Sequence, residues 1–201
     1  KNLKSFFSPD RSQSEKIFFN MDKNPQHFHT ITACESHDFI SEVNMNTPNV
    51  TPNILPLERP VILITGCGSG LGYALTKELY FKNEYRVVAS ARKLRDVEKL
   101  KQHFPQNQNF WVIQMDITDL QEIEMRIAEI YKRWKSIDIL INNAGVSYRS
   151  VVEHMDEESE MHQLNVNYLA PLALVRLVVP SMREKGSGKI INISSVSGMM
   201  A

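Results

Sequence analysis

The sequence has little cysteine and no surplus of charge of either sign. Cys34 and Cys67 are its two cysteines, and they stand far apart in unlike surroundings. A disulfide framework is therefore not expected. The small number of cysteines indicates a reducing compartment such as the cytoplasm. The chain carries 23 basic and 23 acidic residues. This balance gives no electrostatic reason to expect nucleic acid or an anionic membrane as the main partner.

Long hydrophobic runs and metal-ligand patterns are also missing. No apolar run comes near the roughly 20 residues that a membrane-spanning helix needs, and no signal-peptide pattern opens the chain. The 6 histidines show no metal-ligand spacing, so we expect solvated or structural roles for them and no metal site. With 201 residues and 42% hydrophobic content, the chain can bury one core. Lys1 rather than Met opens the sequence, as in a fragment.

Residues 1–58 differ in composition from the rest of the chain. They are rich in Asn, Thr and Pro, and four prolines punctuate the stretch 48–60 just before the first regular apolar run. Each proline biases the residue before it away from helix. We expect a mobile N-terminal extension over 1–58, with a segment that docks on the domain or on a partner as the alternative. A partial domain then covers 59–201.

From Pro60 onward, strand patterns and helix patterns alternate. Apolar runs bounded by turn residues predict buried strands at 61–65, 85–91, 109–116, 137–145 and 188–195. Helical spacing predicts helices at 72–81, 93–104, 119–134 and 157–185. Such alternation implies a parallel sheet covered by helices on both faces. We therefore expect an α/β, doubly wound, Rossmann-like fold.

The first predicted strand runs into a glycine-rich turn, "TGCGSGLG" at 65–72. Glycines permit a tight turn and let a phosphate approach the following helix N-terminus. The spacing G-x-G-x-x-G does not fit, because Leu71 takes the place of its last glycine, and no Gly-Lys-Ser/Thr closes a P-loop. The spacing that fits is T-G-x-x-x-G-x-G, with Gly66, Gly70 and Gly72. Its position between strand and helix favours a dinucleotide site over a bare turn.

At this point the chain resembles the short-chain dehydrogenase/reductase family. "DIT" (116–118) and "NNAG" (142–145) follow the third and fourth predicted strands, "NVNYLAP" (165–171) lies in the long helix, and "INISS" (191–195) ends the fifth strand. The resemblance covers about 60–201. It implies an NAD(P)-dependent oxidoreductase that interconverts an alcohol and a carbonyl by hydride transfer.

The end of the second predicted strand indicates which dinucleotide fits. NAD requires a carboxylate there, about 20 residues after the glycine turn, to accept hydrogen bonds from the ribose hydroxyls. Ser90 and Ala91 are followed instead by Arg92 and Lys93. A guanidinium suits a 2′-phosphate through bidentate charge-assisted hydrogen bonds. NADP is therefore favoured over NAD, and the alternative is that Arg92 is a solvated residue at a helix start.

The glycine turn and the resemblance together predict the cofactor-binding residues. They are Gly66, Ser69, Gly70, Leu71, Gly72, Arg92, Asp116, Ile117, Asn143, Ala144 and Gly145. The segment that includes Asp116 is assigned to the adenine ring by the resemblance. The small residues Ala144 and Gly145 let the backbone lie against the cofactor, and the Asn amides before them can tie neighbouring strand ends together. Cys67 is expected to fill space rather than to act as a redox centre.

Two residues are predicted to be catalytic, Asn167 and Ser195. Pro171 has no N–H, so in an α-helix the carbonyl of Asn167 loses its partner, which predicts a kink and a free acceptor. The resemblance implies that this main chain holds a water in a proton relay. The alternative is a proline kink without chemistry. The resemblance also implies that Ser195 donates a hydrogen bond to the substrate carbonyl.

The family's Tyr-x-x-x-Lys motif, whose lysine lowers the pKa of the tyrosine, would fall beyond Ala201. Tyr73 and Lys77 have this spacing but directly follow the glycine turn. We therefore expect a sheet that is incomplete on its C-terminal side and a chain that is inactive as given, as the front part of a longer enzyme. The alternative is a non-catalytic dinucleotide-binding or interaction module.

The sequence carries fewer signals for the substrate and for the oligomeric state than for the cofactor. The cysteine-containing glycine turn is similar to that of family members acting on retinoids, steroids and other apolar alcohols, so an apolar alcohol or carbonyl compound is expected. The predicted helix 157–185 carries an apolar stripe through which two copies can pair. The acidic run at 153–160 is expected to cap the start of this helix, because carboxylates favour its positive dipole end.

Overall fold

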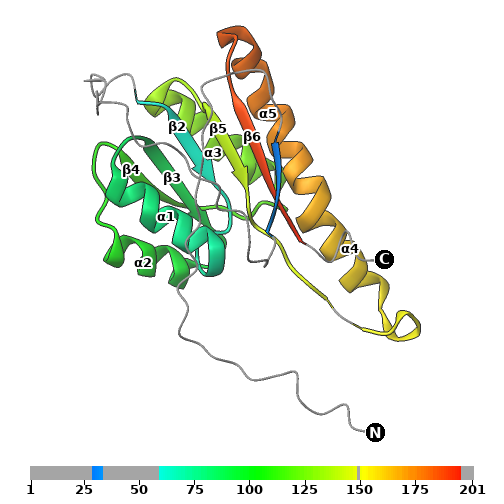
Figure 1. The fold of residues 1–201 in the computed structure, drawn as a ribbon. Helices are drawn as coiled ribbons and strands as arrows, with labels where there is room; N and C mark the ends of the chain where they lie inside the picture. The colour runs from blue at the N-terminus through cyan, green and yellow to red at the C-terminus, as the bar shows by residue number, and fades with distance from the viewer. Residues whose placement is uncertain (1–28, 34–58, 149, 196–201) are drawn as a thin grey trace, which may run out of the picture.

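The computed structural model describes residues 29–33, 59–148 and 150–195 (Figure 1). Six parallel strands form one sheet in the order β1-β6-β5-β2-β3-β4. The strands are β1 His29–Ala33, β2 Val61–Ile64, β3 Arg86–Ala91, β4 Phe110–Gln114, β5 Ile139–Asn142 and β6 Lys189–Ser195. The α-helices are α1 Gly70–Lys82, α2 Leu94–His103, α3 Leu120–Trp134, α4 Glu157–Leu164 and α5 Ala170–Lys185. The predicted doubly wound α/β fold is confirmed.

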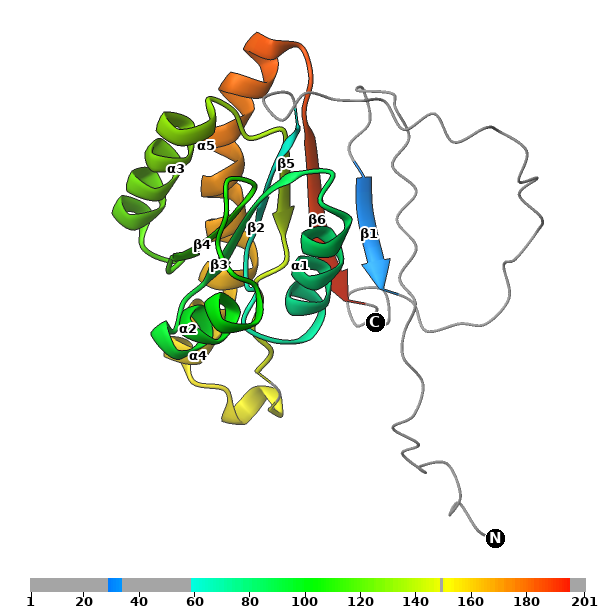
Figure 2. The same ribbon diagram turned by 90° about the vertical axis from the view of Figure 1, so that its left-hand side faces the viewer.

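Helices cover both faces of the sheet, as Figure 2 shows for α1 on one side and for α3 and α5 on the other. Successive residues of β2 point to opposite faces, so Ile62 packs with Leu75 of α1, and Leu63 packs with Ile127 of α3 and Leu174 of α5. Ile62 and Leu63 are both 0% exposed. A strand buried on both faces has to be apolar throughout, which is why "VILI" reads as an unbroken run.

The order of the strands creates a crevice at the centre of the sheet. From β2 the chain moves to β3 and β4 on one side, and β5 and β6 then lie on the other side of β2. The chain after β2 goes on to α1 on one face of the sheet, and the chain after β5 goes on to α5 on the other face. Ligands of open α/β sheets bind at such a point, outside the carboxyl ends of the strands.

A strand lies within the segment for which we expected a mobile extension. β1 runs parallel to β6, with Cα partners from His29 and Ile191 to Ala33 and Ser195. Both views show β1 beside β6 at the edge of the sheet (Figures 1 and 2). These five residues fit the alternative of a docking segment, because the edge of β6 offers backbone groups that an added strand can bond. The mobility of the extension stays a prediction. The predictions for the rest of 1–58, Cys34 included, lie outside the described residues.

The long helix is not one continuous α-helix. A π-helical turn, Asn165–Leu169, separates α4 from α5, and the Ala170 N–H donates to the Asn165 carbonyl five residues back. Pro171 follows at the start of α5. Since proline has no N–H, the α-helical ladder is interrupted there, and the wider turn takes up the change. The predicted local irregularity is confirmed in this form.

The acidic run caps α4, as predicted. The Asp156 carboxylate accepts a hydrogen bond from the Ser159 N–H at 2.8 Å, and Glu157, Glu158 and Glu160 follow in the first turn. This hydrogen bond to the charged form lowers the pKa of Asp156. Capping and the helix dipole therefore fix where the helix begins.

By length and composition, the helical stretch Glu157–Lys185 is apolar enough to cross a membrane, contrary to our expectation from the apolar runs. A core helix of a soluble protein meets the same criteria. Ala170, Leu174 and Val178 belong to this stretch and are buried in the core. In all, 22% of its apolar 18-residue window is buried, so packing against the sheet accounts for part of this apolar character.

Asp138 joins several elements at the amino ends of the strands, at the end of the sheet opposite the crevice. Its Oδ2 accepts hydrogen bonds from the Val61 N–H at 2.7 Å and from the Ser136 hydroxyl at 3.0 Å. Its Oδ1 pairs with Lys185 at the end of α5. Its main chain bonds Val61 and Lys189 at 2.9 Å each. One aspartate thereby sets where β2, β5 and β6 start relative to one another.

We expect Asp138→Ala to lower the free energy of unfolding by about 1–3 kcal/mol, because the Val61 N–H then loses its side-chain acceptor. Asp138→Asn keeps an oxygen at this place and is expected to cost less. Urea denaturation of the two variants and the wild type measures both effects. Equal losses for Ala and Asn would contradict the role of the side-chain oxygen.

Candidate functional site

A cavity of about 450 Å³ lies at the crevice between the carboxyl ends of β2, β3, β4 and β5. It brings together all of the predicted cofactor-binding residues except Gly70. Those on its wall are Gly66, Ser69, Leu71, Gly72, Arg92, Asp116, Ile117, Asn143, Ala144 and Gly145. Residues from four loops far apart in the sequence thus share one cavity.

The glycine turn packs directly on the turn that follows β5. Gly66 has a φ of +72°, and a Cβ there would lie 2.7 Å from the Cα of Ala144. A Cβ at Gly72 would lie 2.4 Å from the Asn143 Nδ2 and from the Gly66 carbonyl oxygen. Neither position has room for a side chain, so the two backbones can approach closely. This contact is the physical reason for glycine at the first and last positions of the motif.

Thr65 fastens the same two turns through its hydroxyl. The Oγ1 accepts hydrogen bonds from the Asn143 N–H at 3.1 Å and from the Ala144 N–H at 3.0 Å. The hydroxyl also lies 3.4 Å from the Ile141 carbonyl, to which it donates. Thr65 is only 1% exposed, so its polar group is buried and bonded.

Two asparagines tie neighbouring strand ends together, as predicted. The Asn143 amide donates to the carbonyls of Thr65 at 2.8 Å and Gly66 at 3.1 Å. The Asn142 amide donates to the Asn192 side chain on β6 at 2.9 Å. The asparagine pair therefore links the end of β5 to the strand on either side of it.

Cys67 lies inside the glycine turn and is 0% exposed. Its N–H donates to the Ser90 carbonyl at 2.8 Å, and its thiol donates to the Ile64 carbonyl at 3.3 Å. Burial raises the pKa of this thiol from 9.0 to about 12, because an apolar environment disfavours the thiolate. A protonated, enclosed thiol agrees with the predicted space-filling role.

The basic end of the cavity also contains a carboxylate that the sequence reasoning missed. Arg92 and Lys93 line the wall, and Asp96 from the first turn of α2 lies beside them. A Cβ added at Gly68 would lie 2.9 Å from the carboxyl carbon of Asp96. The rule for NAD concerns a carboxylate at the strand end itself. Asp96 follows Arg92 by four residues, about one helical turn, and therefore reaches the same cavity wall. This spacing in the sequence could have indicated the carboxylate.

The Asp116 loop is a turn stabilised by its own side chains. The Asp116 Oδ1 accepts from the Thr118 N–H at 2.9 Å and from its hydroxyl at 2.7 Å. The Asp119 N–H donates to the Asp116 carbonyl at 3.2 Å. These bonds hold the carboxylate of Asp116 in one orientation at the cavity wall.

The two predicted catalytic residues do not line this cavity. The side chain of Asn167 makes two hydrogen bonds to the main chain of Val146. Its Nδ2 donates to the Val146 carbonyl at 2.8 Å, and its Oδ1 accepts from the Val146 N–H at 2.9 Å. Sequence reasoning concerned only its main chain and missed this contact. Ser195 is the exposed last residue of β6. The catalytic roles of both stay predictions.

Known proteins resemble the chain in sequence and in fold. A family model described as short chain dehydrogenase matches residues 60–201. The Drosophila melanogaster protein named "Dehydrogenase/reductase SDR family protein 7-like" is 33% identical over 154 residues, which cover 72% of this chain and 46% of that protein. The "NADP-dependent 3-hydroxy acid dehydrogenase YdfG" of Escherichia coli is 29% identical over 139 residues, 69% of this chain and 55% of that protein.

A solved structure of a dehydrogenase is similar to this chain in fold. The closed form of serine dehydrogenase complexed with NADP+ matches with a TM-score of 0.64 at 28% identity, covering 69% of this chain and 55% of that chain. This chain spans about half the length of the curated relatives that it matches.

We expect Gly72→Ala to weaken dinucleotide binding about tenfold or more, because the new methyl group displaces Asn143 and the Gly66 carbonyl. Gly186→Ala is the matched control, since Gly186 ends α5 with a φ of +70° and a Cβ there would meet no atom within 4 Å. The control is expected to lower thermal stability without changing affinity. Calorimetric titration of both variants measures this, and equal affinities would contradict the close-approach argument.

The pH dependence of stability is expected to report on Cys67. The unfolded thiol ionises near pH 9, while the folded thiol stays protonated up to about 12. Its contribution is therefore fully present below pH 9 and is lost as the pH rises from 9 to 12. Cys67→Ala should lose stability less steeply in this window, by up to about 1.4 kcal/mol per pH unit. Urea denaturation at several pH values tests this, and parallel curves would contradict it.

Proposed function

Because the chain belongs to the short-chain dehydrogenase family, we propose that this protein is an NADP-dependent oxidoreductase that interconverts an alcohol and a carbonyl compound. A nicotinamide dinucleotide, when bound, supplies the hydride transfer. The observation that carries the proposal is the single cavity on which the glycine turn, the basic residues after β3 and the turn after β5 meet. The residues of this chain bind and orient the ligands.

The residues present fit a dinucleotide. Gly66 and Gly72 leave backbone rather than side chains at the wall, and Ser69 and Leu71 stand at the N-terminus of α1. A helix N-terminus with accessible N–H groups suits a pyrophosphate, whose negative charge the helix dipole favours. Asp116, held by Thr118, lies on the side of the cavity toward β4 and is proposed to contact the adenine.

Arg92 and Lys93 support NADP over NAD. Both line the cavity, where a guanidinium can hold a 2′-phosphate. YdfG is named NADP-dependent, and the matching serine dehydrogenase structure contains NADP+. Asp96 acts against this preference, since a carboxylate repels a phosphate and accepts hydrogen bonds from ribose hydroxyls. NAD is the weaker ligand in this proposal.

For the chemical step, we keep the roles that the resemblance implies. Ser195 ends β6, and the carboxyl ends of parallel strands lie at the same edge of a sheet, which supports Ser195 as the donor to the substrate carbonyl. The Asn167 main chain is proposed to hold a water, while its side chain positions Val146.

The substrate is proposed to be a small alcohol or carbonyl compound. A second cavity of about 470 Å³ shares Val146 with the first and is also lined by Tyr148, Asp156, His162 and Gln163. A substrate that extends from the first cavity into the second meets these polar side chains. This observation lends no support to a wholly apolar substrate.

Two further proposals concern the protein's surroundings. Met161, Leu164, Tyr168 and Leu169 are large apolar side chains that stay exposed along the long helix, which supports pairing of two copies through it. A cytoplasmic location rests on the small number of cysteines and the balanced charge.

We expect Arg92→Ala to raise the dissociation constant for NADP about tenfold and to leave that for NAD unchanged, because only the 2′-phosphate loses a partner. Arg183→Ala is the control, since Arg183 is an exposed arginine in the last turn of α5 that does not line the cavity. Calorimetric titration with both dinucleotides measures the ratio.

An unchanged ratio in Arg92→Ala would contradict the NADP assignment. A wild-type chain that binds neither dinucleotide would contradict the dinucleotide site itself. A full-length protein that binds NADPH but reduces no carbonyl compound would favour the non-catalytic module.

A further inference from the structure

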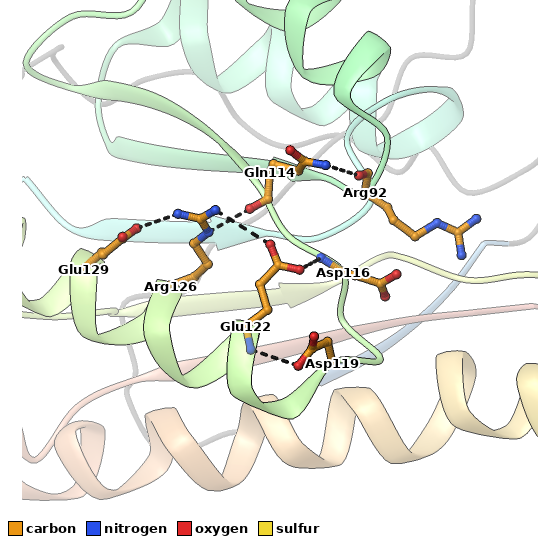
Figure 3. A network of polar contacts seen from close by, with 7 residues as sticks. All are labelled: Arg92, Gln114, Asp116, Asp119, Glu122, Arg126 and Glu129. Atoms are coloured by element: carbon orange, nitrogen blue, oxygen red, sulfur yellow. Dashed lines mark hydrogen bonds and ion pairs between the residues drawn. The ribbon is translucent and has the colours of Figure 1, made fainter.

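Two loops of the cavity are held from outside by side chains of α3 (Figure 3). One loop follows β3 and contains Arg92, and the other follows β4 and contains Asp116. Glu122 bonds the loop after β4, Arg126 bonds the main chain of Gln114 at the end of β4, and the side chain of Gln114 bonds the loop after β3. None of these three side chains belongs to the cavity wall.

Glu122 departs from the bonding that its position predicts. Asp119 caps α3 and accepts a hydrogen bond from the Glu122 N–H at 3.1 Å. In a capping box the glutamate at this place would return to the N–H of the capping residue. Here the Asp119 N–H is bonded to the Asp116 carbonyl, and the Glu122 Oε2 instead accepts from the Asp116 N–H at 3.0 Å. The glutamate thus holds the residue at the cavity wall.

Arg126 connects this glutamate to the end of β4. Its Nε donates to the Gln114 carbonyl at 2.9 Å, and one terminal nitrogen lies 3.7 Å from the Glu122 Oε1. The other terminal nitrogen bonds the Glu129 Oε2 at 3.0 Å. The side chains of Arg126 and Glu122 are 26% and 24% exposed, so solvent screens this pair less than a fully exposed one.

Gln114 completes the connection to the basic loop. Its side-chain Nε2 donates to the Arg92 carbonyl at 3.0 Å. A continuous set of bonds therefore runs from the main chain of Arg92 through Gln114, Arg126 and Glu122 to the main chain of Asp116. The opposite side of the cavity is held separately, by Thr65 and Asn167.

We propose that Glu122 and Arg126 are positioning residues that set the affinity for the adenosine half of the dinucleotide. They hold the loops of Arg92 and Asp116 in the conformation that binds ligand, which reduces the ordering cost of binding. This inference rests on the proposed function. Under the proposed function the nicotinamide half would be held by the separately fixed side, so its affinity is expected to be independent of Glu122.

The test uses two probes, 2′,5′-ADP for the adenosine half and nicotinamide mononucleotide for the other half. In the 201-residue chain, Glu122→Ala is expected to weaken 2′,5′-ADP about fivefold and to leave the mononucleotide unchanged, since the Asp116 N–H loses its acceptor and Arg126 loses one of its carboxylate partners. Glu122→Gln keeps an acceptor for the Asp116 N–H and is expected to recover most of the affinity. Calorimetric titration supplies all of these constants.

Glu129→Ala is the control, because Glu129 also pairs with Arg126 but bonds neither loop. It is expected to change thermal stability as Glu122→Ala does and to leave 2′,5′-ADP affinity unchanged. Hydrogen exchange at the Asp116 amide is expected to accelerate in Glu122→Ala and not in Glu129→Ala. Arg126→Ala is expected to weaken 2′,5′-ADP as well, and it replaces Glu122→Ala if that variant does not fold.

Unchanged 2′,5′-ADP affinity in Glu122→Ala and Arg126→Ala would overturn the inference while leaving the proposed function intact. Equal weakening of both probes would also overturn it, since a general loss of structure predicts that result. A wild-type chain that binds neither NADP nor 2′,5′-ADP would instead overturn the proposed function.

Discussion

The close contact between the turn after β2 and the turn after β5 is the constraint on which the rest of the site depends. Gly66 and Gly72 bring the two backbones together, and the hydroxyl of Thr65 bonds the N–H groups of Asn143 and Ala144. Because both strands are buried on both faces, their ends cannot shift without disturbing the core. The cavity wall therefore has the rigidity of the sheet, although it consists of loops.

Helix α3 serves the core and the site through different faces. Ile123 and Ile127 are buried against the sheet, and Glu122 and Arg126 stand beside them toward the ends of β3 and β4. Packing fixes the helix, so its polar side chains are presented at fixed places. Charged residues that do not touch a ligand can in this way determine how firmly its binding loops are held.

Much of this architecture was predictable because the responsible interactions are local in sequence. The apolar runs gave the strands from β2 to β6, since a strand buried on both faces cannot be polar. The glycine spacing and the "NNAG" segment gave most of the cavity wall. Pro171 gave the irregularity in the long helix, although the width of the π-helical turn did not follow from one missing N–H.

The sequence by itself determined the parallel α/β fold, the glycine turn and the basic residues at the end of β3, because each depends on residue type and short-range spacing. Only the tertiary structure decided the rest. It placed β1 beside β6, Asp96 on the same cavity wall as Arg92, the Asn167 amide on Val146 and the Glu122 carboxylate on the Asp116 N–H. For Glu122, the N–H of the capping residue Asp119 was the nearer partner in the sequence. The packing of the sheet and helices selected which donors and acceptors finally met.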